Sequence, residues 1–203
     1  MCHTHTYSMS DNETALSLQL SLALAVAGSW SAGASLDFDS VPAPQVQPKK
    51  RAFAIWGLLF PSLCALVSYV GKQDVLPDSS VHALIGALAG TIAWASLVRR
   101  RQYGAAAVLL TASAASAFLA FLRLPLTLSP RTPTLLPRMT LGMYAGWLVV
   151  ASMIMAAVAR PTLFDRPNVV AAVALVFGVA VLLGRGQPYP LFSILWALFH
   201  RNV

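Results

Sequence analysis

Long apolar runs are the feature that most constrains how this chain can fold. Six of them cover residues 15–35, 52–70, 82–98, 104–122, 139–159 and 168–184, and a shorter one covers 190–199. A helix needs about 20 apolar residues, with about 17 as a lower limit, to cross the hydrocarbon core of a bilayer. The pattern therefore predicts six full spans and a short seventh helix.

The composition excludes the other common classes of protein. Hydrophobic residues make up 57% of the 203 residues, and charged residues only 10%, whereas soluble domains hold about 25% charged residues. Polar sequence is too scarce for a disordered chain and cysteine too scarce for a disulfide scaffold. The runs also lack the alternating polarity of a membrane barrel. We therefore predict an all-α, polytopic transmembrane helical bundle.

The links between the runs hold most of the prolines and basic residues, which favours one bundle over several domains. We assign residues 1–14 to a polar N-terminal tail and residues 15–200 to a single transmembrane bundle. The tail contains no Lys or Arg, unlike the basic start of a secretory signal. Ala32-Gly33-Ala34 is nevertheless similar to a signal cleavage site, so the sequence leaves open whether residues 1–34 stay in the mature protein.

The basic residues predict an orientation in the membrane. The chain has 14 Lys and Arg against 7 Asp and Glu, a net charge of +7. These residues lie between apolar runs, where they orient helices and meet anionic lipid headgroups, so we expect membrane lipids and no nucleic acid as partners. With seven passes, more basic residues lie on the side of the C-terminus. We therefore expect the N-terminus outside or in a lumen, and the C-terminus on the cytosolic, matrix or stromal side. The sequence does not distinguish an organelle from a bacterial inner membrane.

Ionisable side chains are missing from the depth of the membrane. All seven carboxylates lie outside the runs, whereas ion-coupled carriers need such groups inside. The runs also hold no acid–base pair or nucleophile constellation, so we expect no enzyme activity. His82, at the start of a run, is a weak candidate for the axial metal ligand of a bound tetrapyrrole, and an interfacial histidine is the alternative. We expect no site for a free metal.

Two pairs of glycines have the spacing that brings membrane helices close together. Gly86 and Gly90 form one pair, and Gly142 and Gly146 form the other. Without a Cβ, glycine lets two helix backbones approach closely in lipid. Either pair could pack inside one bundle or hold a partner helix, as in a homodimer.

Six aromatic residues that could line a ligand site lie in four of the runs. They are Trp56, Phe60, Trp94, Tyr144, Trp147 and Trp196. Tryptophan in membrane proteins often anchors a helix at the interface. Aromatic faces from several helices can also enclose a flat apolar ligand. Both interpretations stay open on composition alone.

Four segments together resemble the tryptophan-rich sensory protein family (TspO/MBR-like, translocator), in its longer and divergent branch. Phe53–Phe60, F-A-I-W-G-L-L-F, is similar to the branch's F-S-I-W-G-L-I-Y. Leu136–Ala151 is similar to its L-P-F-S-L-Y-x-G-W-x-x-x-A, and Tyr189–Leu198 to its closing Y-x-x-V-x-x-W-A-L. Thr91–Trp94 adds a match to N-I-A-W. The resemblance covers about residues 52–203.

The resemblance implies a five-helix core around an aromatic cavity that takes a tetrapyrrole (porphyrin, haem or chlorophyll type), or else a lipid or sterol. By position, the implied cavity residues are Trp56, Phe60, Trp94, Tyr144, Trp147 and Trp196. It also implies that Arg51 or Arg138, at helix mouths, pairs with a propionate of the ligand.

Three positions depart from the family pattern. Phe60 replaces a tyrosine, Thr91 an asparagine, and Met155 a further asparagine. These changes replace polar groups that would orient a ligand. Two hypotheses follow: a ligand-binding sensor, receptor or carrier of the TspO type, and an accessory structural subunit of a larger organellar membrane complex, photosynthetic or respiratory, that keeps the fold as a scaffold.

Overall fold

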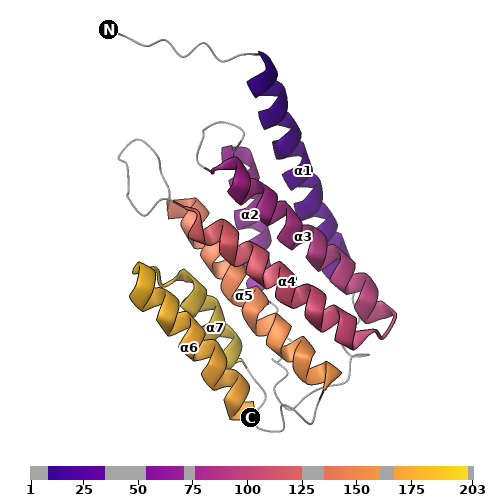
Figure 1. The fold of residues 1–203 in the computed structure, drawn as a ribbon, viewed down its shortest axis with the longest axis vertical. Coiled ribbons are helices and arrows are strands. Elements are labelled where there is room, and N and C mark those ends of the chain that lie inside the picture. Colours follow the sequence, from indigo (N-terminus) through magenta and orange to yellow (C-terminus); the bar gives the residue numbers. More distant parts are fainter. Residues whose placement is uncertain (1–8, 35–53, 71–75, 125–134, 161–166, 201–203) are drawn as a thin grey trace.

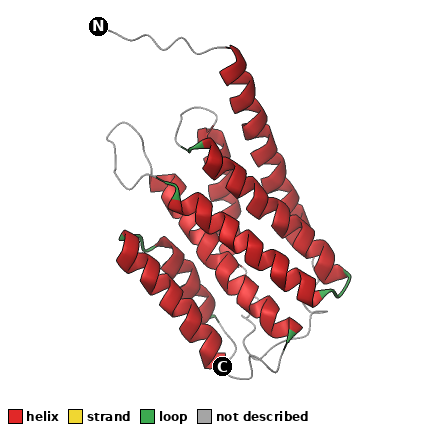
Figure 2. Ribbon diagram, in the orientation of Figure 1, coloured by secondary structure: helices red, strands yellow, loops and turns green. Residues whose placement is uncertain are grey.

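The described residues fold into seven helices. The structure, a computed structural model, describes residues 9–34, 54–70, 76–124, 135–160 and 167–200, and within these ranges all long elements are helical (Figure 2). In chain order they are α1 (Met9–Ala34), α2 (Trp56–Val70), α3 (Asp78–Arg99), α4 (Tyr103–Leu122), α5 (Leu135–Ala159), α6 (Pro167–Arg185) and α7 (Tyr189–Phe199). The predicted all-α bundle is confirmed.

Successive helices run in alternating directions (Figure 1). Helices α1, α3, α5 and α7 begin at the end that is uppermost in Figure 1, which we call the upper end, and α2, α4 and α6 begin at the lower end. The first residue of α1 and the last residue of α7 therefore lie at opposite ends of the bundle. This arrangement agrees with an odd number of passes.

Helix α5 lies at the centre of the packing. It contacts α2, α4, α6 and α7, while α1 packs on α2 and α3, and α3 packs on α4. From Pro137 to Leu148 every residue of α5 except Met139 is buried. A helix that is buried all round belongs to the core of a bundle. Side chains on different faces of α5 thus meet different helices.

Among the described helices, three are long and apolar enough to cross a membrane: α3, α4 and α5. In the rest of the described chain the apolar helical segments are shorter, and they cover Leu16–Ser31, Trp56–Ser68, Ala172–Arg185 and Tyr189–Phe199. The largest difference from the sequence prediction concerns residues 52–70, where a full span was expected. Helix α2 begins at Trp56 and has only 15 residues. At 1.5 Å per residue its length is about 22 Å.

Helix α5 begins earlier than its apolar run. The run predicted a start at residue 139, but the helix starts at Leu135, so Pro137 and Arg138 lie in its first turn and not in the preceding link. Proline is tolerated there because the first backbone N–H groups of a helix have no partner within the helix. Arg138 is consequently buried, with 5% of its surface exposed.

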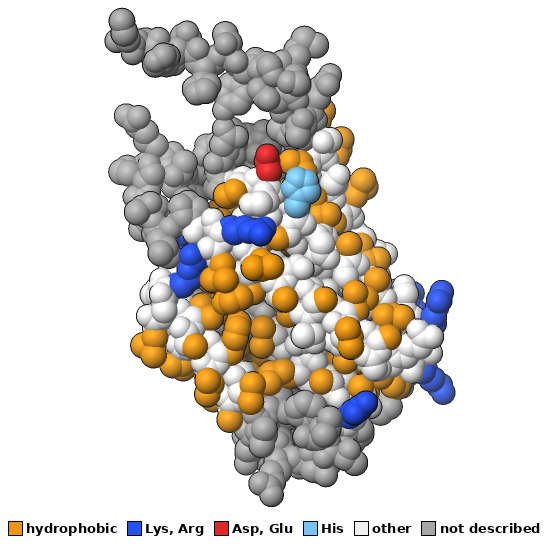
Figure 3. Space-filling view, in the orientation of Figure 1, with side chains coloured by type: hydrophobic (Ala, Val, Ile, Leu, Met, Phe, Trp, Pro, Cys, Tyr) orange, Lys and Arg blue, Asp and Glu red, His pale blue; other side chains and the backbone are white. Residues whose placement is uncertain are grey.

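The outer surface is apolar between two levels of basic residues. On the face shown in Figure 3, Lys and Arg side chains lie near the upper and lower ends and leave an apolar belt between them. Large apolar side chains on the outside include Leu24, Val108, Val176, Leu183 and Phe199. Such a belt suits contact with lipid tails.

The predicted glycine contacts are made within one chain at three of the four positions. A Cβ on Gly142 would lie 2.8 Å from Tyr189 Cβ, and a Cβ on Gly146 would lie 2.8 Å from Pro190 Cα, so α5 and α7 meet at these glycines. Gly90 faces the Ser113 side chain of α4 in the same way. Gly86 has open space around it. A partner helix at Gly86 stays a prediction.

Candidate ligand-binding site

Five aromatic rings from α1, α2 and α5 meet, four of them buried or half-buried and Trp30 at the surface with 48% of its area exposed. We call them the aromatic cluster: Trp30, Trp56, Phe60, Tyr144 and Trp147. Trp56 stacks on Phe60, with 4.8 Å between the ring centroids. The same indole meets Tyr144 and Trp147 edge-on, at 6.4 and 6.0 Å. Trp30 lies 4.9 Å from Phe60 and adds a ring from α1.

Helical spacing explains how the cluster forms. Trp56 and Phe60 lie one turn apart at the start of α2, so their rings share a face. Tyr144 and Trp147, three residues apart, share a face of α5. Both are almost fully buried, with 0% and 2% of their surface exposed, whereas Trp56 is half-buried. The Tyr144 and Trp147 side chains on α5 are therefore fixed by packing in the core, and Trp56 on α2 is more accessible.

A hydrogen bond between hydroxyls joins α3 to the cluster. Thr91 Oγ1 lies 3.1 Å from the Tyr144 hydroxyl and also donates to the Ala87 carbonyl at 3.0 Å. Because the threonine hydrogen is used on that carbonyl, Tyr144 donates to Thr91. The sequence comparison treated Thr91 as a loss of polarity, but its hydroxyl still makes a polar contact inside the bundle. The Tyr144 oxygen keeps its capacity to accept a hydrogen bond.

Two buried donors lie on helices that border the cluster. Trp94 follows Thr91 by three residues, and Ser29 precedes Trp30. Within the described part of the chain, neither Trp94 Nε1 nor Ser29 Oγ has a hydrogen-bond partner, although both atoms are buried. Buried polar groups in proteins are nearly always paired with protein, water or a ligand. These atoms can therefore serve an acceptor on a bound molecule.

Trp196 lies away from the aromatic cluster. It is on α7, where it contacts Phe192 and His200, with centroid distances of 6.5 and 4.6 Å. Helix α7 packs on a different face of α5, which carries Gly142 and Gly146, and Ser193 Oγ donates to the Met143 carbonyl there at 2.7 Å. The structure thus brings together Trp56, Phe60, Tyr144 and Trp147 of the predicted set and leaves Trp196 outside the cluster.

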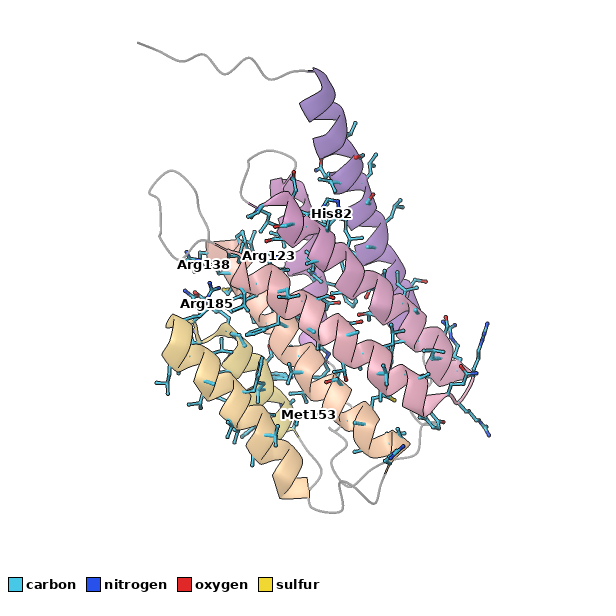
Figure 4. All side chains as sticks on the ribbon, in the orientation of Figure 1. His82, Arg123, Arg138, Met153 and Arg185 are labelled. Atoms are coloured by element: carbon cyan, nitrogen blue, oxygen red, sulfur yellow. The ribbon has the colours of Figure 1, made fainter. Side chains whose placement is uncertain are left out.

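His82 and Arg138, predicted as a metal ligand and a charged ligand contact, also lie apart from the cluster. His82 is exposed in the first turn of α3, about 18 Å along the helix from Trp94, and its Nδ1 donates to the Asp78 carbonyl at 2.8 Å. Arg138 lies at the upper end, about 9 Å along α5 from Tyr144. Figure 4 shows His82 and Arg138 at this end. Arg51 lies outside the described residues. Ligand roles for these residues stay predictions.

The arrangement of buried aromatic rings in an all-helical membrane bundle agrees with the result of the family comparison. A family model described as "TSPO-like protein" matches residues 38–199. The chain belongs to the TSPO-like protein family. The match includes all of α2 to α7, and the TSPO-like chain is thus an integral membrane protein. No curated protein and no solved structure matched it.

Helix α1 adds to the site from outside the region matched to the TSPO-like family. The match begins at residue 38, whereas Ser29 and Trp30 lie on α1. Sequence analysis missed Trp30 because the family segments begin near residue 52. The signal that could have identified it is a tryptophan inside the first apolar run, since a span that carries one has an aromatic face to offer to its neighbours.

Proposed function

We propose that this TSPO-like membrane protein binds a flat hydrophobic ligand at the aromatic cluster and acts as a sensor, receptor or carrier without catalysis. The observation that carries the proposal is the position of the Trp56 ring. It lies within 6.4 Å of rings on α5 while it stacks on Phe60 of its own helix. Rings from separate helices that meet face and edge can hold a planar molecule between them.

The ligand enters between α2 and α5 by displacing Trp56. In the described state the rings contact one another, so a planar ligand has to separate them. Trp56 is the ring best placed to move, because it is the first residue of α2 and is half-buried. Tyr144 and Trp147 are fixed in the buried face of α5 and form the wall against which the ligand stacks.

A tetrapyrrole fits the chemistry of this place well, and a sterol or another lipid is the alternative. A porphyrin has a wide aromatic face for the rings and carboxylates that accept hydrogen bonds. Trp94 Nε1 and Ser29 Oγ, which lack partners in the described part of the chain, supply buried donors. A sterol has the apolar face but a single hydroxyl, and so makes less use of these donors.

Titration of the full chain in detergent with protoporphyrin, followed by the Soret band and by quenching of tryptophan fluorescence, tests the proposal. We expect Trp56→Ala to weaken binding by about three- to tenfold, as the loss of an aromatic contact predicts. Trp196→Ala is the matched control, because this ring lies outside the cluster, and we expect its affinity to be unchanged. Trp56→Phe, which keeps an aromatic ring, should fall between the two.

Equal affinities of the Trp56→Ala and Trp196→Ala proteins would contradict the proposal. Competition by cholesterol against protoporphyrin separates the two ligand classes. If cholesterol binds and protoporphyrin does not, and Trp56→Ala weakens the sterol, the cluster is a sterol site.

One observation favours the second candidate, an accessory subunit of a larger membrane complex. Gly86 has open space around it, and Ala89 and Ala93 are exposed on the same helix. Small residues on an outward face let a second helix approach closely. Extraction of native membranes in mild detergent and a native gel test this candidate. Migration in a large assembly that is lost with Gly86→Leu supports it, and a small species for both proteins contradicts it.

A further inference from the structure

Three arginines lie together at the upper end of the bundle, outside the aromatic cluster (Figure 4). Arg123 follows the last turn of α4, Arg138 lies in the first turn of α5, and Arg185 is the last residue of α6. They are far apart in sequence, and the fold brings their three helix ends together.

Phe121 shows how close these helix ends are. Arg185 Nη1 donates to the Phe121 carbonyl at 3.3 Å, and its guanidinium carbon lies 6.0 Å from the centroid of the Phe121 ring. Arg123 lies two residues further along the same chain segment. A Cβ on Gly142 would lie 3.1 Å from the same ring, and Gly142 lies one turn from Arg138 on one face of α5. Arg185 thus contacts Phe121 directly, Arg123 lies two residues after it, and Arg138 lies one turn from the glycine that faces its ring.

The described hydrogen bonds of Arg123 and Arg185 do not neutralise the positive charges of these side chains. Arg123 Nη1 donates to the Ser79 carbonyl at 2.8 Å, and Arg185 donates to the Phe121 carbonyl. Both acceptors are neutral, and a guanidinium has five N–H donors. Asp78, which is exposed, is the one acidic residue among the side chains that the structure describes. Arg123 and Arg185 each help to satisfy a backbone carbonyl near a helix end and still have donors for an anion.

An apolar strip begins beside this positive end. Leu119, one turn before Arg123, has 47% of its surface exposed, and Val108 continues along the same side of α4 with 73% exposed. A free anion would use only the arginines. A molecule with an anionic head and long apolar tails would use the strip as well.

We infer that the end formed by α4, α5 and α6 is a binding site for an anionic phospholipid. Arg123 and Arg185 bind the phosphate through charge-assisted hydrogen bonds, and Arg138 adds positive charge from α5. The acyl chains lie along Leu119 and Val108 of α4. The site is separate from the aromatic cluster and does not depend on the proposed ligand there.

Native mass spectrometry of the full chain in a non-ionic detergent tests the inference. The protein is titrated with phosphatidylglycerol and with phosphatidylcholine of the same acyl chains. We expect phosphatidylglycerol to bind more tightly. A basic residue near a membrane surface adds about 1 kcal/mol to binding of an anionic lipid, so Arg123→Gln and Arg185→Gln should each weaken phosphatidylglycerol binding by about fivefold. Phosphatidylcholine binding should not change.

Arg100→Gln is the matched control. Arg100 is exposed in the short turn between α3 and α4 at the lower end, so this variant removes one positive charge without touching the site. Its phosphatidylglycerol affinity should equal that of the unmodified protein. Equal binding of the two lipids, or an equal loss in the Arg100→Gln and Arg123→Gln proteins, would overturn the inference.

Two further measurements are needed. One shows whether a loss of binding comes from misfolding of the variant, and the other whether the site takes a lipid headgroup or a free phosphate. Arg185→Lys keeps the charge and should keep most of the preference for phosphatidylglycerol, even if Arg185→Gln disturbs the end of α4. Inorganic phosphate in excess should compete poorly, because it gains nothing from the apolar strip. Full displacement of the lipid by inorganic phosphate would show a site for a free anion instead, and would also overturn the inference.

Discussion

The hydroxyls of Thr91 and Tyr144 lie 3.1 Å apart and link α3 to α5 across the interior of the bundle. Both side chains are buried. In a membrane protein a hydrogen bond of this kind contributes modestly, because the unfolded chain in lipid also finds partners.

A double-mutant cycle measures this contact. We expect Tyr144→Phe and Thr91→Val to show a coupling of about 0.6 kcal/mol in the free energy of unfolding. Thr111→Val is the control, since Thr111 Oγ1 bonds only to the Ala107 carbonyl of its own helix among the described residues, and its coupling to Tyr144→Phe should be zero. Unfolding in mixed micelles with a denaturing detergent gives the four values. A zero coupling for Thr91 would contradict the contact.

The contact between α5 and α7 is sensitive to one methyl group. A Cβ on Gly146 would lie 2.8 Å from Pro190 Cα, and the backbone cannot rotate away as a side chain does. We expect Gly146→Ala to lower stability by about 1–3 kcal/mol, as overpacking does. Gly86→Ala, where the added Cβ meets open space, should be neutral or slightly stabilising. Thermal unfolding in detergent compares the two, and equal midpoints would contradict the described packing.

Two buried serines should respond to truncation with opposite signs. Ser29 Oγ is buried without a partner among the described residues, so Ser29→Ala removes an unpaired hydroxyl and should leave stability equal or raise it. Ser193 Oγ donates to the Met143 carbonyl at 2.7 Å, and Ser193→Ala should lower stability by about 1 kcal/mol. The same unfolding assay, without added ligand, checks both. A loss of stability in Ser29→Ala would show that this hydroxyl has a partner.

The alternating directions of the helices predict which residues face the same side of the membrane. Ser79, at the start of α3, and Gln102, between α3 and α4, are both exposed and lie at opposite ends of the bundle. In a chain with both native cysteines replaced by serine, Ser79→Cys and Gln102→Cys should react with a membrane-impermeant thiol reagent from opposite sides. From the positive-inside rule we expect Ser79→Cys to react from the outside. Labelling of both from one side would exclude the predicted topology.

The sequence predicts the helices well because bilayer thickness sets the length of an apolar run. The sequence predicts poorly which face of each helix is buried in the bundle and which face is exposed. Val108 has 73% of its surface exposed and Leu110 only 1%, yet both are aliphatic, because lipid and protein interior are equally apolar surroundings. The same ambiguity explains why Trp147 and Trp196 could not be separated. Each is a tryptophan in an apolar run, and only the packing of α7 on a different face of α5 shows that one belongs to the aromatic cluster.

The glycines of α5 predicted a close helix contact that the structure contains. The glycine pair of Gly142 and Gly146 was expected to bring a helix close, and α7 packs there. The partner could not be named, because the spacing of glycines on one helix carries no information about the other helix. Trp30 was missed for a related reason. Its contact with Phe60 joins α1 to α2 across a long link. Nothing in the sequence of either apolar run indicates that the two helices are neighbours.

The position of Pro190 against Gly142 and Gly146 has a consequence for biosynthesis. The ribosome completes α5 well before it reaches α7, and folding begins at the N-terminal part of a chain during synthesis. The glycine face of α5 therefore spends the interval against lipid, which cannot fill its groove as the Pro190 backbone does. Helix α7, which is translated after α5, completes the wall around this central helix. A chain truncated before residue 189 would insert in the membrane with the groove at Gly142 and Gly146 unfilled. This packing defect would mark the chain for quality-control proteases.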